Sequence, residues 1–256
     1  MKKIRLSALA FASLFVINTH AQFAEATVSY DPGTGFSPGF TNASSALDEP
    51  SRVTPGAFGG PVDVFNPPYL SGQLVSVGTG GSLTVKFKTP VLNHPQNRFG
   101  IDFVIFGNAG YIITNDFSFE TFDWIGIPAT DASLFGANAG ETRVSVSRDG
   151  ETFHQLNPAL APTVDGPLPT DGAGDFHTPV DPTLTPADLA GLTAAQIRVL
   201  YFGSAGGAGY DISWAQTVDG KPVKLPAINY IRVEVVSGKS EVDGFASVFV
   251  PPGHAR

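Results

Sequence analysis

The stretch NYIRVEVVSGKSEVDGFASVFV, from Asn229 to Val250, decides the fold class of this chain. Between Ile231 and Val235, apolar residues alternate with charged ones, which is the period of a strand with one buried face. Ser237 to Ser240 are turn formers, and a second apolar run begins at Val242. The pattern predicts an antiparallel hairpin, with Asp243-Gly244 in its returning arm.

Two further stretches predict strands. Arg143 to Leu156, RVSVSRDGETFHQL, has the pattern of a second hairpin, with Asp149-Gly150 as its turn. Phe99 to Asn108, FGIDFVIFGN, has the length and apolar content of a central strand that is buried on both faces. Together with 29 glycines and 21 prolines for turns, these stretches predict an all-β antiparallel sandwich with long loops.

Shorter patterns predict the remaining elements. A strand is expected from Ala26 to Tyr30, and an elaborated loop from Tyr111 to Gly140. Asn157 to Pro186 contains seven prolines and is expected to be a long surface connection. Thr185 to Leu189 begins like a helical turn, with Thr at the N-cap and Pro at the first helical position. Ile197 to Phe202 is predicted to be a strand.

We expect the chain to be exported as one domain. Residues 1–21 have a basic start, an apolar middle and a small residue before the cleavage point, which predicts a cleaved signal peptide. Residues 22–250 are predicted to form a single β-sandwich domain, in which 22–69 are an irregular N-terminal segment, and 251–256 form a tail. The expected location is the cell surface or the medium, with no transmembrane segment in the mature chain.

Composition excludes several classes of function. The sequence has no cysteine, so thiol catalysis, iron–sulfur clusters and thiolate zinc sites are excluded. The net charge is −8 and no run of Lys or Arg exists, which argues against nucleic acid as a partner. A hydrophobic content of 42% is sufficient for a packed core, so intrinsic disorder is not expected.

Five short motifs occur in a fixed order along the chain. They are Gly80-Gly81-Ser82-Leu83-Thr84-Val85, Asp102-Phe103-Val104-Ile105-Phe106-Gly107-Asn108, Val146-Ser147-Arg148-Asp149-Gly150, Gly209-Tyr210-Asp211-Ile212-Ser213-Trp214-Ala215 and Val242-Asp243-Gly244-Phe245. In this order they resemble a group of exported bacterial cell-surface proteins, many of them sorted by a PEP-CTERM signal. At the C-terminus, Val250-Pro251-Pro252-Gly253 stands where that signal would start, and we expect the sorting tail to be absent.

The Ser147-to-Phe153 hairpin and the later Tyr230-Ile231-Arg232-Val233 run are also similar to the galactose-binding-like, or discoidin-like, jelly-roll sandwich. This resemblance implies a sandwich of the jelly-roll type. It also implies that loops bind glycans or surfaces, and that the fold holds a structural calcium ion.

Four polar residues beside apolar strands are candidate metal ligands. Asp102, Asp211 and Asp243 have no adjacent basic residue, and an unpaired buried carboxylate is costly. Calcium takes about six to eight oxygen ligands from carboxylates, amides and backbone carbonyls. With Asn108, these three aspartates are predicted to converge on calcium at one end of the sandwich. The alternative is that each carboxylate accepts backbone hydrogen bonds or pairs with an arginine.

Aromatic residues near glycines and loops are candidates for stacking on sugar rings, whose C–H faces pack well on π surfaces. The predicted ligand-binding residues are Tyr210, Trp214, Trp124 and Tyr111. Core packing is the alternative for these rings. Glu120 and Asp123 would serve as the carboxylate pair if the protein were a glycoside hydrolase.

From these patterns we expect an exported, non-catalytic surface or matrix protein. Its predicted partner is an extracellular polysaccharide or cell-surface glycan, bound through loops, with calcium as a stabilising ion. The alternatives are a purely structural surface component and, third, a glycoside hydrolase.

Overall fold

The computed structural model describes residues 22–57, 59–135 and 140–248. Strands account for 40% of the structure and helices for 10%, and the main ladders are antiparallel. The predicted all-β sandwich is therefore confirmed. The predicted signal peptide at 1–21 and tail at 251–256 lie outside the described residues.

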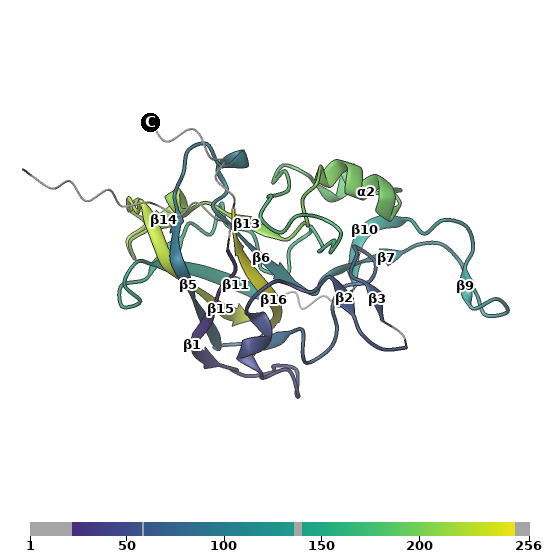
Figure 1. Cartoon of the computed structure of the whole chain (residues 1–256), viewed down its shortest axis with the longest axis horizontal. Coiled ribbons are helices and arrows are strands. Elements are labelled where there is room, and N and C mark those ends of the chain that lie inside the picture. Colours follow the sequence, from purple (N-terminus) through teal and green to yellow (C-terminus); the bar gives the residue numbers. More distant parts are fainter. Residues whose placement is uncertain (1–21, 58, 136–139, 249–256) are drawn as a thin grey trace, which may run out of the picture.

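A six-stranded antiparallel sheet forms one layer of the sandwich (Figure 1). Its strands, in spatial order, are β1 (Ala26–Asp31), β5 (Ser82–Leu92), β15 (Ala227–Ser237), β11 (Glu141–Ser147), β12 (His154–Leu156) and β14 (Ala215–Gln216). The strand predicted at the N-terminus is β1, and β11 with β12 is the hairpin predicted around Asp149-Gly150.

A four-stranded antiparallel sheet forms the second layer. Its strands, in spatial order, are β13 (Ala208–Tyr210), β6 (Phe103–Gly107), β16 (Lys239–Ser247) and β4 (Val75–Gly78). Every residue of β6 is buried, which confirms the prediction of a central strand covered on both faces.

The hairpin predicted from Asn229 to Val250 is wrong in its pairing. Both strands exist, but β15 lies in the six-stranded sheet and β16 in the four-stranded sheet. Gly238, at φ 71°, carries the chain from one layer to the other. The connection from β4 to β5 crosses beside it, and the Gly80 N–H donates to the Val235 carbonyl at 2.8 Å. The two connections between the sheets, β4 to β5 and β15 to β16, are therefore hydrogen-bonded to each other.

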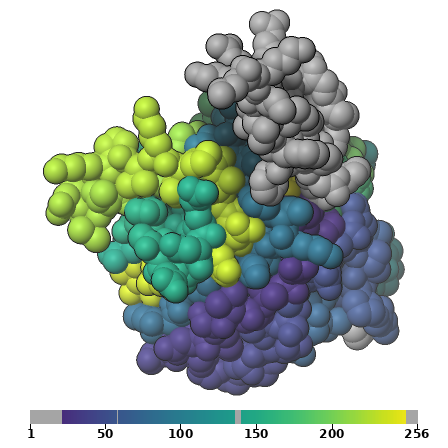
Figure 2. Space-filling view, turned by 60° about the vertical axis from the view of Figure 1, so that its left-hand side comes forward, coloured from purple at the N-terminus to yellow at the C-terminus, as the bar shows by residue number. Residues whose placement is uncertain are grey.

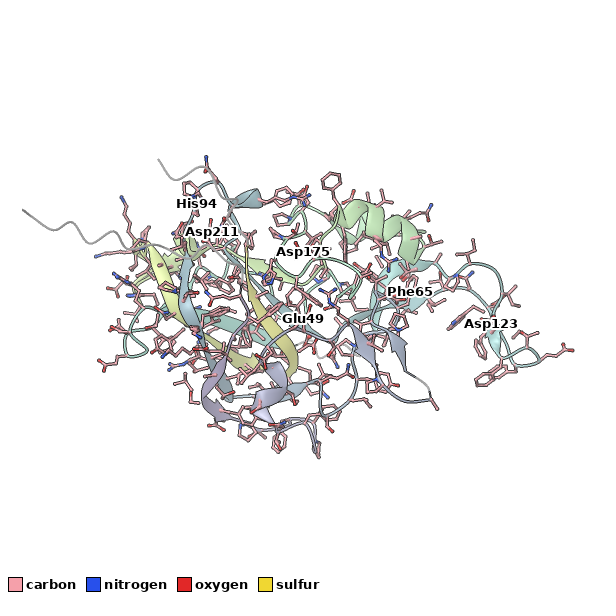
Figure 3. All side chains as sticks on the ribbon, in the orientation of Figure 1. Glu49, Phe65, His94, Asp123, Asp175 and Asp211 are labelled. Carbon is pink, nitrogen blue, oxygen red and sulfur yellow. The ribbon has the colours of Figure 1, made fainter. Side chains whose placement is uncertain are left out.

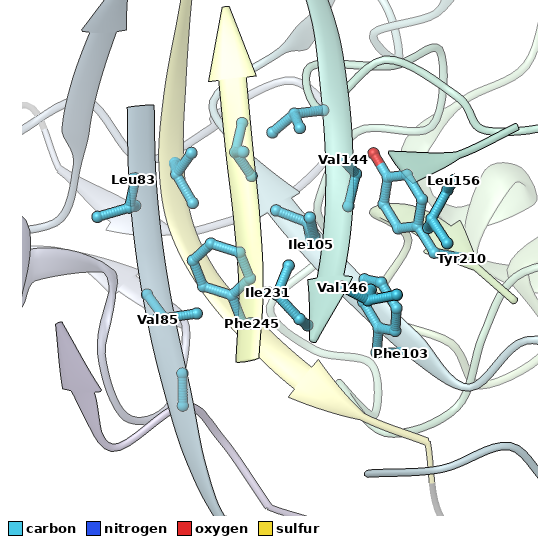
Figure 4. Packing of buried hydrophobic residues seen from close by; sticks show 14 of the residues in the cluster. Leu83, Val85, Phe103, Ile105, Val144, Val146, Leu156, Tyr210, Ile231 and Phe245 are labelled. Carbon is cyan, nitrogen blue, oxygen red and sulfur yellow. The ribbon is translucent and has the colours of Figure 1, made fainter. Parts of the chain in front are cut away.

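The main core fills the space between the two sheets (Figure 4). The six-stranded sheet contributes alternate residues such as Val85, Val144 and Ile231, and the four-stranded sheet contributes residues such as Ile105 and Phe245. All of them are fully or almost fully buried. The period-two patterns of the sequence thus place their apolar halves in this layer.

The opposite face of the four-stranded sheet is covered by the connection after β12. Val104 and Phe106 pack there against Phe176 and Ala205. The rings of Phe106 and Phe176 meet edge to face, with centroids 5.0 Å apart. The segment 157–186 is therefore part of the packed structure, and its prediction as a surface connection is wrong for its buried residues.

Beside the sandwich lies a smaller cluster of short elements (Figure 1). Its strands and helices are β7 (Gly110–Ile113), β10 (Thr130–Phe135), α1 (Pro186–Leu189) and α2 (Ala194–Tyr201). The helical turn predicted at Thr185 is α1, with Thr185 as its N-cap. The strand predicted from Ile197 to Phe202 is wrong, because Thr193 and Gln196 form a capping box that starts α2.

The remaining elements are short. They are the strands β2 (Val53–Thr54), β3 (Gly60–Pro61), β8 (Phe117–Ser118) and β9 (Asp123–Trp124), and the 3-10 helices η1 (Ala43–Ala46), η2 (Arg98–Gly100) and η3 (Ile212–Trp214). β8 and β9 form a small hairpin that projects from the body of the molecule (Figure 1).

Candidate functional site

The outer face of the six-stranded sheet carries a row of polar residues that crosses five of its strands. In register, the neighbouring positions of this row are Thr84, Arg232, Ser145, Gln155 and Gln216. Because neighbouring strands lie about 4.8 Å apart, the row is about 19 Å long. We call it the polar row.

A cleft of about 470 Å³ lies along the polar row. Besides members of the row, Thr152 and Phe153 line it from the turn before β12, and Thr217 and Val218 line it from the loop after β14. Both loops reach the surface side by side in Figure 2, the first in teal and the second in yellow-green. The cleft therefore combines segments that are far apart in the sequence.

Arg232 lines the cleft and is held in a defined orientation. Its guanidinium carbon lies 3.7 Å from the centroid of the Phe153 ring, which is a close cation–π contact. Its Nε donates to the Thr84 hydroxyl at 3.1 Å. A planar guanidinium fixed on both sides presents its other N–H groups to a ligand at a small cost in side-chain entropy.

Other polar groups of the cleft are free to bind a ligand. Among the described residues, no hydrogen bond or ion pair of the chain engages the side chains of Gln155, Gln216 or Glu234, which are all partly exposed. Amides supply both donors and acceptors, and a carboxylate accepts. Such a set, beside an aromatic ring, matches a ligand that has hydroxyl groups and apolar C–H faces.

Two of the four predicted aromatic residues lie in the core. Tyr111 and Tyr210 are 1% and 0% exposed, and their hydroxyls donate to the carbonyls of Pro167 and Pro162. The Tyr210 ring stacks on Phe103 with centroids 5.2 Å apart. Neither ring face is presented to solvent, so the prediction that they stack on a ligand fails for a physical reason.

The two tryptophans lie at separate places. Trp214 is half-buried against the main core and lines an apolar cavity of about 110 Å³ beside Gly207 and Gly209. Trp124 belongs to β9 and packs edge to face on Phe117, with centroids 5.1 Å apart. The structure does not bring these rings together, and neither lines the cleft on the six-stranded sheet.

The predicted metal ligands are also dispersed. Asp102 precedes β6 and Asn108 follows it, so about 20 Å of extended strand separates them. Asn108 donates to Glu241 at 2.5 Å, and Asp243 accepts from the backbone N–H and the hydroxyl of Ser51 at 2.8 and 2.7 Å. Among the described residues, no three His, Asp or Glu side chains are placed to hold a metal ion. Asp211 lies close enough to Asp102 for its charge to raise the pKa of Asp102.

Three buried carboxyls, those of Asp102, Asp165 and Asp243, have raised pKa values. Burial is the main cause in each case, and it raises the pKa of Asp102 and of Asp243 to about 7 and that of Asp165 to about 6. Hydrogen bonds from Ile212 and His94 oppose the shift at Asp102, while the charge of Asp211 adds to it. These groups are therefore partly protonated near neutral pH.

Glu120 and Asp123 lie on the projecting β8–β9 hairpin (Figure 3, Asp123). Both are exposed, and Asp123 accepts from the Trp124 N–H at 2.8 Å. Phe119 and Phe122 beside them are 86% and 75% exposed, so no enclosed site surrounds the carboxylates. The arrangement does not resemble a glycosidase site, in which two carboxylates flank a bound sugar.

The residues of the cleft are not among the Trp and Tyr positions that the sequence predicts to bind a ligand. A signal was present, since Arg232 and Glu234 occupy the outward positions of the alternating strand, and Phe153 follows the Asp149-Gly150 turn. No pattern in the sequence shows that Gln155 and Gln216 lie in line with them.

No protein-family model and no curated protein matches this chain. Among the described residues, no helix is long and apolar enough to cross a bilayer.

Proposed function

We propose that this protein is an exported, non-catalytic cell-surface or matrix protein that binds an extracellular glycan in the cleft along the polar row. The observation that carries the proposal is the set of unpaired polar side chains beside the fixed Arg232–Phe153 pair. The proposed binding site differs in location from the one that the sequence predicts, because its residues lie on the face of a sheet instead of around Tyr210 and Trp214.

The shape and chemistry of the cleft support a chain-like ligand. The polar row is about 19 Å long and crosses the strands, so it is longer than one sugar ring. Gln155 and Gln216 lie along it, and Arg232 with Phe153 supplies hydrogen-bond donors next to an apolar surface. The cleft contains both signs of charge, in Arg232 and Glu234, so a neutral glycan suits it better than a strongly charged one.

The proposal is tested with a glycan array on the purified chain. We expect binding to at least one class of polysaccharide, and a loss of at least tenfold in affinity for Arg232→Ala and for Phe153→Ala. The matched control is Arg98→Ala, because Arg98 also lies over phenylalanine rings, those of Phe99 and Phe202, outside the cleft. The control should bind as the wild type does.

Other outcomes decide between the remaining functions. Silence across a broad array would contradict the proposal and favour a purely structural component. Binding that survives Arg232→Ala and Phe153→Ala would place the ligand elsewhere. Release of reducing sugar that disappears in Glu120→Gln would show a glycoside hydrolase.

A further inference from the structure

The tip of the β8–β9 hairpin presents large apolar side chains to solvent. They are Phe119, Phe122, Ile125 and Ile127, and all four are exposed. The Phe117 ring packs edge to face against the rings of Phe119 and Phe122, with centroids 5.3 and 5.4 Å away, and holds both in place. The hairpin projects beyond α2 in Figure 1, so the body of the molecule does not cover it. We call the four exposed residues the hairpin face.

A second exposed apolar group lies where α2 ends. Phe202 is the C-cap of α2 and is 75% exposed, and Val199, one turn before it, is 72% exposed. Phe99 of η2 is also exposed. Arg98 brings the two rings together, because its guanidinium carbon lies 4.8 Å from the centroid of Phe99 and 5.1 Å from that of Phe202. We call Phe99, Val199, Phe202 and Arg98 the α2 patch.

Both surfaces contain phenylalanines whose backbone is left-handed. The φ angles of Phe99, Phe122 and Phe202 are 58°, 54° and 49°. This conformation is costly for a bulky residue, whereas glycine or asparagine adopts it readily. In the described part of the chain, only two other non-glycine residues have a positive φ, Asp48 and Ala132. Exposed rings add nothing to the core, so strain at these three positions indicates that the rings serve an interaction.

The two surfaces differ in charge. Glu120 and Asp123 are exposed beside the hairpin face, and the sequence has no Lys or Arg between Arg98 and Arg143. Arg98 forms no ion pair with any described residue, and the charge of Asp181 acts on it from beyond ion-pair distance. The hairpin face is therefore apolar with negative neighbours, and the α2 patch is apolar with a positive group that is available to a partner.

Two other partners suit the hairpin face less well. Surfaces that bind membranes place Lys or Arg beside their apolar residues, and the hairpin has carboxylates there instead. A second hairpin face would bring like charges together, which is unfavourable at an interface. The α2 patch offers both aromatic rings and the opposite charge.

We propose that the hairpin face of one copy of this chain docks on the α2 patch of a second copy. The contact buries exposed phenylalanines of both copies and sets Arg98 against the carboxylates of the hairpin. Because two different surfaces meet, the contact repeats along a chain of copies or closes into a ring. It uses no residue of the polar row or the cleft, so it does not depend on glycan binding. With few side chains involved, it belongs to the small, transient class of interfaces.

Light scattering on the purified chain tests the contact by measuring mass against concentration. From about 10 µM to about 1 mM, we expect the mass to rise above that of a monomer and then above that of a dimer. Phe119→Ser with Phe122→Asn, and separately Val199→Gln with Phe202→Asn, should associate at least about tenfold more weakly. Asparagine tolerates a positive φ, so both variants should melt as the wild type does.

Mixing the two variants identifies the surfaces that meet. The α2 patch of the first variant and the hairpin face of the second are intact, so the mixture should form a one-to-one dimer and nothing larger. Contact between two hairpin faces would instead leave the second variant associating as the wild type does. The matched control is Val28→Thr with Val53→Thr, which changes exposed apolar residues of β1 and β2 outside both surfaces. The control should associate like the wild type.

Three results would overturn the proposal. The first is a wild-type chain that stays monomeric up to about 1 mM, where a contact of this class should form. The second is a mixture of the two variants that yields no dimer. The third is a monomeric wild type that binds phosphatidylcholine vesicles and loses this binding in Phe119→Ser with Phe122→Asn, because the hairpin face would then bind lipid.

Discussion

The two sheets of the sandwich differ in what covers their outer faces. The six-stranded sheet has one face in the main core and the other in solvent, where the polar row and the cleft lie. The four-stranded sheet is covered on both faces, by the first sheet on one side and by Phe176 and Ala205 on the other. A ligand can therefore reach the face of only one sheet.

The same difference explains where the buried carboxylates lie. On the open sheet, polar residues occupy the outward positions, and Arg232, Gln155 and Gln216 among them are partly exposed. On the covered sheet, Asp102 and Asp243 lie at positions from which water is excluded, and both have raised pKa values. The comparison teaches that, of the two sheets, only the six-stranded one has an outer face with a cleft that a ligand could enter.

The largest expected effect on stability comes from removing the packing that covers the outer face of the four-stranded sheet. Phe176→Ala removes a ring that is 1% exposed and packs on Phe106, and we expect it to lower the free energy of unfolding by about 3–5 kcal/mol. Gln155→Ala on the open face should change it by less than about 0.5 kcal/mol. Urea denaturation measures both. Equal effects would show that the cover is not part of the cooperative core.

The second prediction concerns how stability depends on pH through the buried carboxyls of the four-stranded sheet. Asp102 and Asp243 titrate at about 7 in the folded protein, above their unfolded value of about 4. Their contribution to stability is therefore fully present below pH ~4 and is lost as the pH rises to ~7, with a slope of up to about 1.4 kcal/mol per pH unit for each group.

Denaturation curves between pH ~4 and ~7 measure this dependence. Asp243→Asn should flatten the slope, because an amide does not titrate. Asp149→Asn is the control, since hydrogen bonds from Thr152, Glu151 and Ser147 lower the pKa of that exposed carboxyl to about 2. A free energy of unfolding that rises from pH ~4 to ~7 would contradict the prediction.

The smallest expected effect on stability belongs to the open face. Arg232→Lys keeps the positive charge but loses the planar contact with Phe153 and the fixed geometry of the guanidinium. We expect glycan affinity to fall about tenfold, while the free energy of unfolding falls by less than about 1 kcal/mol. Calorimetric titration with the glycan found on the array, and urea denaturation, measure the two. A large loss of stability with unchanged binding would reverse the roles assigned to the two sheets.

For β15 and β6, the sequence by itself determined both the strand and the faces that it buries. The alternation in β15 predicts a strand with one buried face, and the continuous apolar run of β6 predicts a strand that is buried on both faces. The structure has both. The turn at Asp149-Gly150 predicts the β11–β12 hairpin, because a local turn specifies the pairing of its own two arms. Local patterns suffice where the contacts are local.

The tertiary structure alone decided how those strands are distributed between layers. The arms of the quoted stretch differ in burial, since β15 alternates while eight of the nine residues of β16 are buried, and this difference sends them to different sheets. Period two states which side chains share a face, but it does not state which strand lies alongside. The hydrogen-bonding partners of an edge can come from any part of the chain.

The same reason limits what the sequence says about the sites. The polar row joins β5, β15, β11, β12 and β14, which come from distant parts of the chain. No local pattern relates Gln155 to Arg232. Their meeting depends on sheet order and on burial, which many distant contacts determine together.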